Sequence, residues 1–421
     1  MNLKQLRTVI PQLLIDKNIQ TQNVYSLYKP VYIITKLLCL ASFTLHHSKN
    51  NSKKMYYALQ VVFVCFMVYL TVLSYADKMV LKSFGNSTII VYINRVLSIL
   101  LLIVTIITFL TSHVHARYIP KILKTIRTLD KVISKRKYQI PTRFKLFNII
   151  LLLLYTFFFQ LLVGEIVLDL YLKSQVSIDK IFRCLCRILS AATILQYATI
   201  LNLLYWRFVI VNNLIKLIKL NDEDQTIFEL KLCSTILQQL YDICKRINTI
   251  FGIFLASVLF VIFTEYLETM FAFLATYWML GIKIVDRPRI EELGFWEITI
   301  NNFLATILHC YVVFFFADLI HKEVNRTNDV LEELHLRSYF CSKVLKTICQ
   351  LYHQINHNKF VFTAGKFIDL GWHQAFMMFG GVISYSIVSS QLYLNVKQKE
   401  FDLPAVSIPS LLCVRVFKTF V

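Results

Sequence analysis

The sequence predicts an all-α polytopic membrane protein with seven transmembrane helices, an inside N-terminus, an outside C-terminus and a cytoplasmic helical anchor region. Of the 421 residues, 57% are hydrophobic and 17% are charged, whereas soluble domains have about 45–50% and about 25%. Seven stretches of at least 18 residues contain no Asp, Glu, Lys or Arg, and a helix needs ~20 residues to cross a bilayer. These stretches are 55–76, 96–116, 146–164, 188–206, 247–264, 298–317 and 370–396.

The distribution of charge orients the seven predicted spans. Loops on the side of the N-terminus carry 31 Lys and Arg against 13 acidic residues, whereas the opposite side carries 14 against 12. The positive-inside rule places the first side in the cytoplasm. The net charge of +20 is therefore a topology signal, and no nucleic-acid partner is expected. Asn86 begins an Asn-Ser-Thr tripeptide on the predicted outside and is the candidate glycosylation site.

Three segments outside the charge-free stretches also have helical patterns. Residues 28–46 contain a charge-free piece of only 12 residues, which predicts a re-entrant or interfacial helix. After Glu265 and Glu268 the apolar run of the fifth span continues to Ile282, with no Pro and no Gly before Gly281, so one long tilted helix is expected there. Residues 318–369 have apolar side chains at helical spacing, which must be buried against something, and neighbouring subunits are the expected partner. This apolar stripe consists of Val344, Leu345, Ile348, Leu351 and Ile355.

Enzymes and coupled transporters are disfavoured by the sequence. His353 and His357 lie one helical turn apart, but no third metal ligand accompanies them, so neither a metal site nor a cofactor is expected. The acidic residues near the membrane lie at the ends of the spans rather than inside them. Two alternatives stay open. A G-protein-coupled type of receptor would need an outside N-terminus, and a lipid-modifying membrane enzyme would need a His and Asp cluster on one face.

The last span carries a motif. Ser384-Tyr385 is followed by five residues and then by Gln391-Leu392. This resembles the signature of insect gustatory receptors, in which Thr-Tyr is followed by five mostly apolar residues and Gln-Phe. Ser for Thr and Leu for Phe are the departures. The approach to this span is also similar to that of the family, at Phe362, Ala364, Phe367, Asp369 and Leu370.

The resemblance implies a ligand-gated, non-selective cation channel that is assembled as a homotetramer or heteromer and lies in the plasma membrane of sensory dendrites. Its partners would be a small-molecule tastant, permeant cations and membrane lipid. Ser386 stands where sugar-tuned members commonly have an acidic residue, which favours a bitter or plant-derived tastant. The implied parts are a cytoplasmic N-terminus (1–54), a six-span ligand-binding domain (55–317), a cytoplasmic anchor for subunit contacts (318–369), a pore-lining seventh span (370–396) and an extracellular tail (397–421).

Pore-lining residues follow from helical spacing in the last span. Ser384, Ile387, Val388 and Gln391 share one helix face. Four copies of this face would form rings of hydroxyl and amide groups around an apolar constriction. The alternative is that Ser384 and Gln391 join neighbouring helices by hydrogen bonds.

Candidate ligand-pocket residues are aromatic or polar side chains in the predicted outer halves of the spans. Small-molecule sites are mostly apolar with a few convergent polar groups. The alternative for each aromatic is simple packing or lipid contact. The candidates are Tyr92, Phe158, Gln160, Glu265, Tyr266, Tyr277, Trp278 and Asn302.

Overall fold

The structure, a computed structural model, is built mainly from helices. It describes residues 24–38, 40–41, 51–76, 88–134, 143–173, 178–218, 220, 222–281, 289–337, 342–358 and 360–401. The helices are α2 (Val24–Leu37), α3 (Asn51–Ala76), α5 (Thr88–Ser134), α6 (Arg143–Lys173), α7 (Ile178–Lys216), α8 (Glu223–Gly281), α9 (Arg289–Arg337), α10 (Ser342–His357) and α11 (Trp372–Phe401). Strands β1 (Thr363–Ala364) and β2 (Ile368–Asp369) form an antiparallel hairpin between α10 and α11. The prediction of a helical protein is confirmed for these ranges.

Each predicted span falls in its own long helix. The helices α3, α5, α6, α7, α8, α9 and α11 contain the seven charge-free stretches in order, except that α11 begins at Trp372 rather than at residue 370. Four helices, α5, α7, α8 and α9, contain a described segment that is long and apolar enough to cross a membrane. In α3 and α6 the described apolar segments are shorter. The number of spans and the side of each terminus therefore stay predictions.

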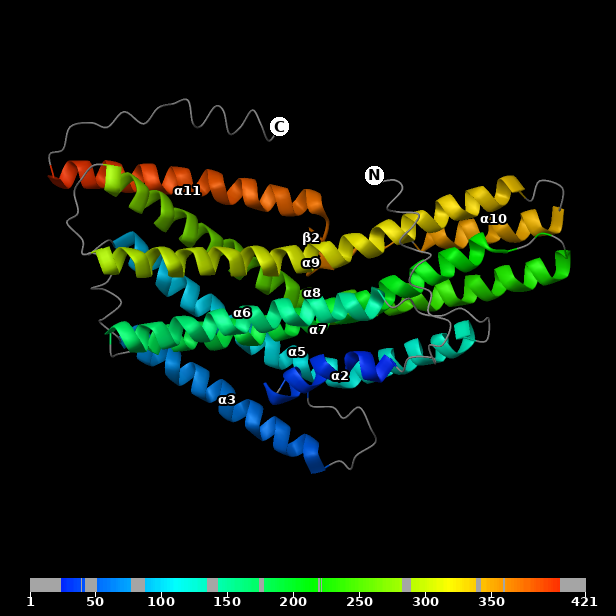
Figure 1. Cartoon of the computed structure of the whole chain (residues 1–421), viewed down its shortest axis with the longest axis horizontal. Coiled ribbons are helices and arrows are strands. Elements are labelled where there is room, and N and C mark those ends of the chain that lie inside the picture. The colour runs from blue at the N-terminus through cyan, green and yellow to red at the C-terminus, as the bar shows by residue number, and fades with distance from the viewer. Residues whose placement is uncertain are drawn as a thin grey trace.

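The long helices lie side by side along the long axis of the molecule (Figure 1). At one end, α10 lies beside the last part of α9 and the first part of α8. We call this end the base. Towards the other end, α11 packs on α8 and α9. The chain thus has a bundle of long helices that narrows into a base of helix ends.

Helix α7 lies at the centre of this bundle. It contacts α2, α3, α5, α6, α8 and α9. Residues 191–204 are all buried, which is a run of fourteen. A helix that is surrounded by other helices must be able to bury every face. In α7 most of the buried residues are apolar, and the polar Gln196 and Asn202 form hydrogen bonds with α2 and α6.

Helix α8 is continuous over 59 residues, which confirms the single long helix expected for the fifth span. It begins where the carboxylate of Asp222 accepts hydrogen bonds from the backbone N–H groups of Asp224 and Gln225, at 3.0 and 3.3 Å. This is an N-cap, and Glu223 and Asp224 add negative charge in the first turn, where the helix dipole favours it. Glu223 and Asp224 therefore belong to the start of α8.

Helix α2 covers the side of α7. Val24, Tyr28 and Val31 are buried, and the phenol oxygen of Tyr28 accepts a hydrogen bond of 2.6 Å from Nε2 of Gln196. The helix starts four residues earlier than the segment predicted from residue 28. With 14 residues it is too short to span a bilayer, as expected.

The apolar stripe of α10 is packed differently from the prediction. Val344, Ile348, Leu351 and Ile355 are buried within the chain itself, and α10 contacts α8 and α9. The expectation that these side chains are buried against neighbouring subunits is therefore wrong. The hydrophobic faces of α8 and α9 extend beyond the spans and cover these four side chains, whereas Leu345 is half-buried. Subunit contacts through residues 318–369 stay a prediction.

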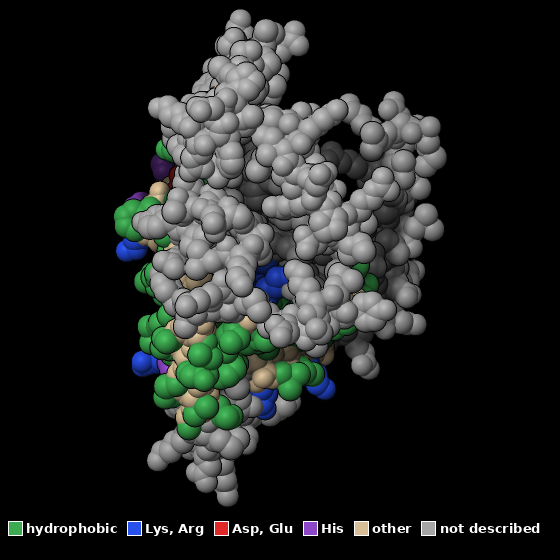
Figure 2. Space-filling model, turned by 90° about the vertical axis from the view of Figure 1, so that its left-hand side faces the viewer, with side chains coloured by type: hydrophobic (Ala, Val, Ile, Leu, Met, Phe, Trp, Pro, Cys, Tyr) green, Lys and Arg blue, Asp and Glu red, His purple; other side chains and the backbone are tan. Residues whose placement is uncertain are grey.

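The outer surface of the bundle is apolar. Leu59, Val61, Val62, Phe66 and Tyr69 of α3 are exposed. Figure 2 shows one end of the molecule, where most of the coloured side chains are hydrophobic, with isolated Lys and Arg among them. Exposed apolar surface on long helices is expected where a protein contacts lipid.

Candidate functional site

The predicted pore residues of α11 face away from the core of the chain. The side of α11 that packs inward is formed by Ala375, Val382, Ser386 and Ser390, all of which are buried. Ser384, Ile387, Val388 and Gln391 lie on the opposite side of the helix, and Val388 is 52% exposed. The chain covers this face only in part, because Val388 is exposed whereas Ser384, Ile387 and Gln391 are half-buried. Their role as pore-lining residues stays a prediction.

The polar groups of this outward face are oriented by the helix itself. The hydroxyl of Ser384 donates to the carbonyl oxygen of Gly380 at 2.9 Å. Because the hydroxyl hydrogen is used there, the oxygen lone pairs of Ser384 are left to face outward. Gly380 and Gly381 have no side chain, and nothing lies within 4 Å of where a Cβ would be. This part of α11 therefore carries no side chain at Gly380 and Gly381, and its polar groups are the hydroxyl of Ser384 and the amide of Gln391.

An aromatic cluster joins α11 to α8 and α9. The ring of Tyr266 in α8 stacks on Phe303 of α9 at 5.3 Å between centroids. The same ring meets Phe379 of α11 edge-on at 5.4 Å. Tyr266 is buried. One predicted pocket residue therefore touches the helix that carries the predicted pore.

Next to Tyr266, two ion pairs link α8 to α7. Nε of Arg187 lies 2.9 Å from the carboxylate of Glu265, and both side chains are almost fully buried. Arg183 lies 3.5 Å from Glu268. A buried charge needs an oppositely charged partner, because removing one unpaired ion from water costs roughly several kcal/mol of desolvation free energy. Glu265 was predicted as a pocket residue, whereas Arg183 and Arg187 were missed because they fall outside the charge-free stretches.

The structure brings together only part of the predicted pocket. Glu265 and Tyr266 adjoin each other in α8, whereas Gln160 is exposed on α6. For the remaining candidates the side chains lie outside the described residues, as do all atoms of Asn86. These candidates are Tyr92, Phe158, Tyr277, Trp278 and Asn302, together with the motif residue Leu392.

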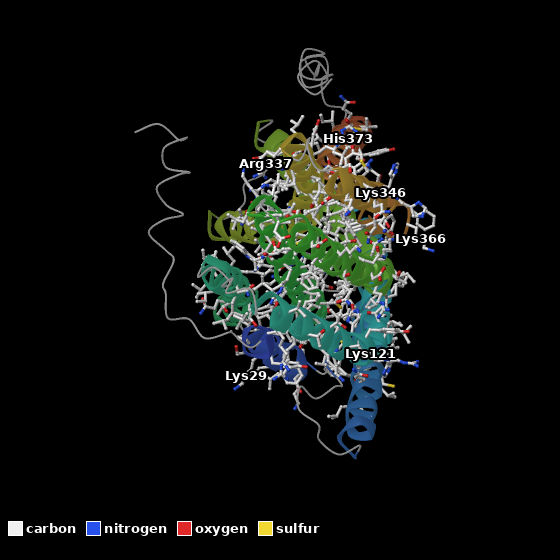
Figure 3. All side chains as sticks on the ribbon, turned by 90° about the vertical axis from the view of Figure 1, so that its right-hand side faces the viewer. Lys29, Lys121, Arg337, Lys346, Lys366 and His373 are labelled. Atoms are coloured by element: carbon white, nitrogen blue, oxygen red, sulfur yellow. The ribbon has the colours of Figure 1, made fainter. Side chains whose placement is uncertain are left out.

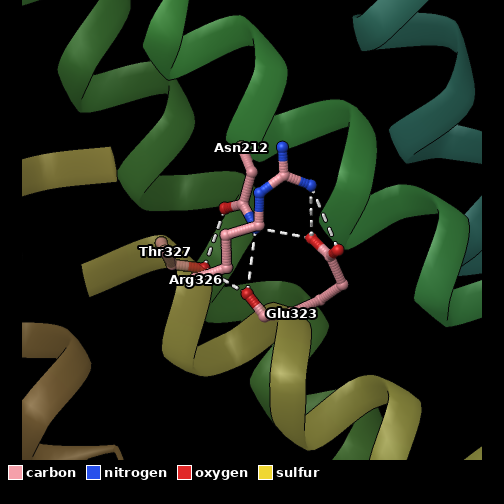
Figure 4. A network of polar contacts seen from close by, with 4 residues as sticks. All are labelled: Asn212, Glu323, Arg326 and Thr327. Atoms are coloured by element: carbon pink, nitrogen blue, oxygen red, sulfur yellow. Dashed lines mark hydrogen bonds and ion pairs between the residues drawn. The ribbon is translucent and has the colours of Figure 1, made fainter. Parts of the chain in front are cut away.

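A polar network lies nearer the base, between α7 and α9 (Figure 4). Nδ2 of Asn212 donates to the backbone oxygen and the carboxylate of Glu323, at 2.9 and 3.1 Å. The hydroxyl of Thr327 donates to Oδ1 of Asn212 at 2.8 Å, and Arg326 pairs with Glu323 at 3.2 Å. This network could not be predicted from the sequence, because Asn212 and Glu323 lie more than 100 residues apart along the chain.

A second buried pair joins α5 to α7. Arg207 is fully buried, and its guanidinium contacts both carboxylate oxygens of Asp130, at 3.1 and 2.8 Å. It also donates to the backbone oxygen of Leu203 at 2.6 Å. Arg187, Arg207 and Asn212 are spaced along α7, so the polar groups of this helix bind it to three different neighbours.

Among the described residues, no group of three or more His, Cys, Asp and Glu side chains is placed to hold a metal ion. The polar groups of the two halves of the bundle are instead engaged with one another.

Comparison with known proteins identifies the family to which the chain belongs. The family described as "7tm Chemosensory receptor" matches residues 28–395. The fold is similar to that of the insect olfactory receptor OR5 from Machilis hrabei in complex with eugenol, with a TM-score of 0.61, 11% identity and coverage of 88% of this chain and 100% of that chain. A second structure of the same receptor gives a TM-score of 0.59, 12% identity and coverage of 86% and 97%. No curated protein matched.

The match extends over most of the chain and includes both α11 and the hairpin before it. It confirms the prediction of an insect-type chemosensory receptor rather than an enzyme. The family, the apolar helices and the apolar outer surface together make this a multi-pass membrane protein. The chain belongs to the 7tm chemosensory receptor family.

Proposed function

We propose that this receptor is a ligand-gated, non-selective cation channel of the gustatory type, which detects a small-molecule tastant of the bitter or plant-derived class. The observation that carries the proposal is the outward face of α11, formed by Ser384, Ile387, Val388 and Gln391, which the chain covers only in part. At membrane depth, a polar face needs either another protein surface or a water-filled path.

A pore formed by several copies of α11 satisfies that requirement. The outward lone pairs of Ser384 and the amide oxygen of Gln391 would face partly hydrated cations without a fixed charge. Ile387 and Val388 lie between these polar positions and would form an apolar constriction that gates by loss of water. A homotetramer or a heteromer with related receptors would supply the copies.

The ligand site proposed here includes Glu265 and Tyr266. The Tyr266 ring lies among Phe303 and Phe379, and the Arg187–Glu265 pair lies beside it. The fold resembles an olfactory receptor described in complex with eugenol, a small phenol, which supports a small aromatic ligand. Because Tyr266 touches Phe379 of α11, a ligand bound here would act directly on the pore helix.

The experiment compares two opposite charges at position 391. Gln391→Lys should abolish cation current, because like unit charges about 4 Å apart cost roughly 4 kcal/mol at an effective dielectric constant near 20. Gln391→Glu should instead raise the permeability of cations over anions. Surface labelling serves as the control for assembly. Normal conduction by Gln391→Lys would show that Gln391 binds a neighbouring helix and does not line the pore.

The proposed orientation places the base in the cytoplasm and the chain in the plasma membrane, with the dendrite of a sensory neuron implied by the family. The exposed Lys29, Lys121 and Lys366 at the edge of the view onto the base support it (Figure 3). The test is glycosylation at Asn86. A mobility shift should disappear in Asn86→Gln, and one that disappears only in Asn325→Gln would reverse the orientation. An inside N-terminus also separates this channel from a G-protein-coupled type of receptor.

A further inference from the structure

The short hairpin before α11 has an unusual backbone. β1 and β2 pair Thr363 with Asp369 and Ala364 with Ile368. The turn between them places both Gly365 and Lys366 in the left-handed region, with φ of 61° and 65°. Glycine adopts that region without strain, but a lysine does so at a cost of about 1 kcal/mol. Such backbone persists where surrounding contacts impose it.

Those contacts come from α8. The side chain of Asn248 donates from Nδ2 to the hydroxyl of Thr363 at 3.2 Å and accepts from the backbone N–H of Thr363 at 2.8 Å. One turn further along α8, the backbone oxygen of Gly252 accepts from the N–H of Gly365 at 2.8 Å. We call these three hydrogen bonds the clamp.

The close approach of the two backbones depends on Gly365. A Cβ at Gly365 would lie 3.0 Å from the Cβ of Ala256 in α8 and 3.3 Å from the ring of Phe367. A side chain there would also have to adopt the left-handed conformation. At Gly252, by contrast, an added Cβ would meet backbone atoms of the hairpin at 3.5 Å or more, which is ordinary contact. Gly365 is therefore the residue on which the clamp depends sterically.

The clamp holds the inner end of α11. Leu370 donates its N–H to the oxygen of Phe362 at 2.7 Å, which closes the hairpin, and α11 begins two residues later at Trp372. Further along, α11 meets α8 again where Phe379 contacts Tyr266. Asn248 and Tyr266 are 18 residues apart in one continuous helix, which corresponds to roughly 27 Å. Helix α8 thus contacts the hairpin at the clamp and contacts α11 over a further stretch that includes Tyr266.

We infer that the clamp couples α8 to the pore helix, so that Asn248 and Gly365 are positioning residues that set the balance between closed and open channels. The inference rests on the proposed channel function. When α8 moves, three hydrogen bonds carry the start of α11 with it. Without them the start of α11 can move independently of α8, and a displacement of α8 reaches α11 only through the contact between the two helices near Tyr266.

The test uses the full-length receptor in liposomes and needs no identified ligand. Two quantities are measured: hydrogen exchange of residues 360–371, and the flux of thallium ions per receptor without any added compound. Asn248→Leu removes both side-chain bonds at nearly constant volume, and Gly365→Ala strains the turn. Thr363→Ser retains the hydroxyl and is the conservative variant. Asn358→Leu is the matched control, because Asn358 bonds Gln238 of α8 without touching the hairpin.

Asn248→Leu and Gly365→Ala should accelerate exchange in the hairpin and change the unliganded flux by roughly five-fold or more. Thr363→Ser and Asn358→Leu should leave the flux within about two-fold of the wild type. Faster exchange with an unchanged flux would overturn the coupling and leave the clamp a structural feature only. Unchanged exchange in Asn248→Leu and Gly365→Ala would overturn the clamp itself.

The flux measurement distinguishes a failure of the channel proposal from a failure of the coupling. If the wild-type receptor and all variants, including Gln391→Glu, carry no flux either alone or with small aromatic compounds added, the channel proposal is wrong, and the coupling falls with it. The exchange measurement would still report whether the hairpin is held by α8.

Discussion

Helices α7 and α11 differ in whether their buried polar side chains form hydrogen bonds with other helices. In α7, Gln196 bonds Tyr28 of α2 and Asn202 bonds Asn148 of α6. In α11, the hydroxyls of Ser386 and Ser390 are buried, and no described residue forms a hydrogen bond with either. Of the other polar side chains described in α11, His373 and Tyr385 are exposed, and Ser384 and Gln391 are half-buried.

The difference separates a structural helix from one that is incomplete in a single chain. A helix surrounded on all sides can pair its polar groups within the protein, and α7 forms such pairs with five other helices. A helix that packs on one side only, as α11 does on α8 and α9, leaves its other side for water, lipid or another copy. Substitutions in α7 should therefore change stability, whereas substitutions on the outward face of α11 should change conduction.

The largest effect is expected at the buried pair of α5 and α7. Asp130→Ala removes the carboxylate that pairs with the buried guanidinium of Arg207, which should destabilise the protein by about 3–5 kcal/mol. Thermal unfolding of the receptor in detergent measures this. Asp318→Ala is the control, because Asp318 pairs with an exposed lysine and should change stability by less than about 1 kcal/mol. Equal effects of the two substitutions would show that burial does not distinguish α7.

The next effect concerns the base. Ile348 is 2% exposed, and Ile348→Ala removes buried methyl and methylene groups, which should cost about 2–5 kcal/mol. Because the stripe packs within the chain, the loss should be seen in thermal unfolding of subunits that have been separated in detergent. If Ile348→Ala alters only the ratio of tetramers to single chains on native gels, the stripe does join subunits after all. Cys349→Ala, next to it and exposed, is the control.

A smaller effect is expected in the network between α7 and α9. Thr327→Val removes the hydroxyl that donates to Asn212 and leaves a buried amide oxygen without that partner. The expected loss is about 1–3 kcal/mol. Thr347→Val is a suitable control, since Thr347 is on α10 and bonds only a carbonyl of its own helix at an exposed position. No loss in Thr327→Val would mean that the network adds nothing to the packing of α7.

The smallest change in stability is expected for the buried serines of α11, and it distinguishes them from the hydrogen-bonded polar residues of α7. Ser386→Ala and Ser390→Ala should leave the free energy of unfolding unchanged or raise it by up to about 1 kcal/mol, because a buried hydroxyl without a hydrogen bond is removed. Gln196→Leu in α7 should lower it, since Gln196 bonds Tyr28. A clear loss of stability in either serine variant would show that its hydroxyl is bonded in the assembled receptor, by a group outside the single chain.

Several site residues were predictable because their signal is local. The motif from Ser384 to Gln391 lies within two turns of one helix, so helical spacing alone placed its residues on one face. Glu265 and Tyr266 were predicted because charged and aromatic groups interrupt an apolar run. The partners of these residues were not predictable in the same way. Arg187 and Phe379 come from other helices, and no pattern along the chain connects them to position 265 or 266.

The sequence by itself determined the helical class, the seven apolar segments, the continuity of α8 and the outward face of α11. Each of these depends on the period and length of an apolar run, which are properties of neighbouring residues. Tertiary structure decided what covers each face. The stripe of α10 was expected to meet other subunits, but α8 and α9 cover it. The clamp between Asn248 and Thr363 could not be foreseen, because its two sides lie 115 residues apart and strands of two residues leave no periodic signal.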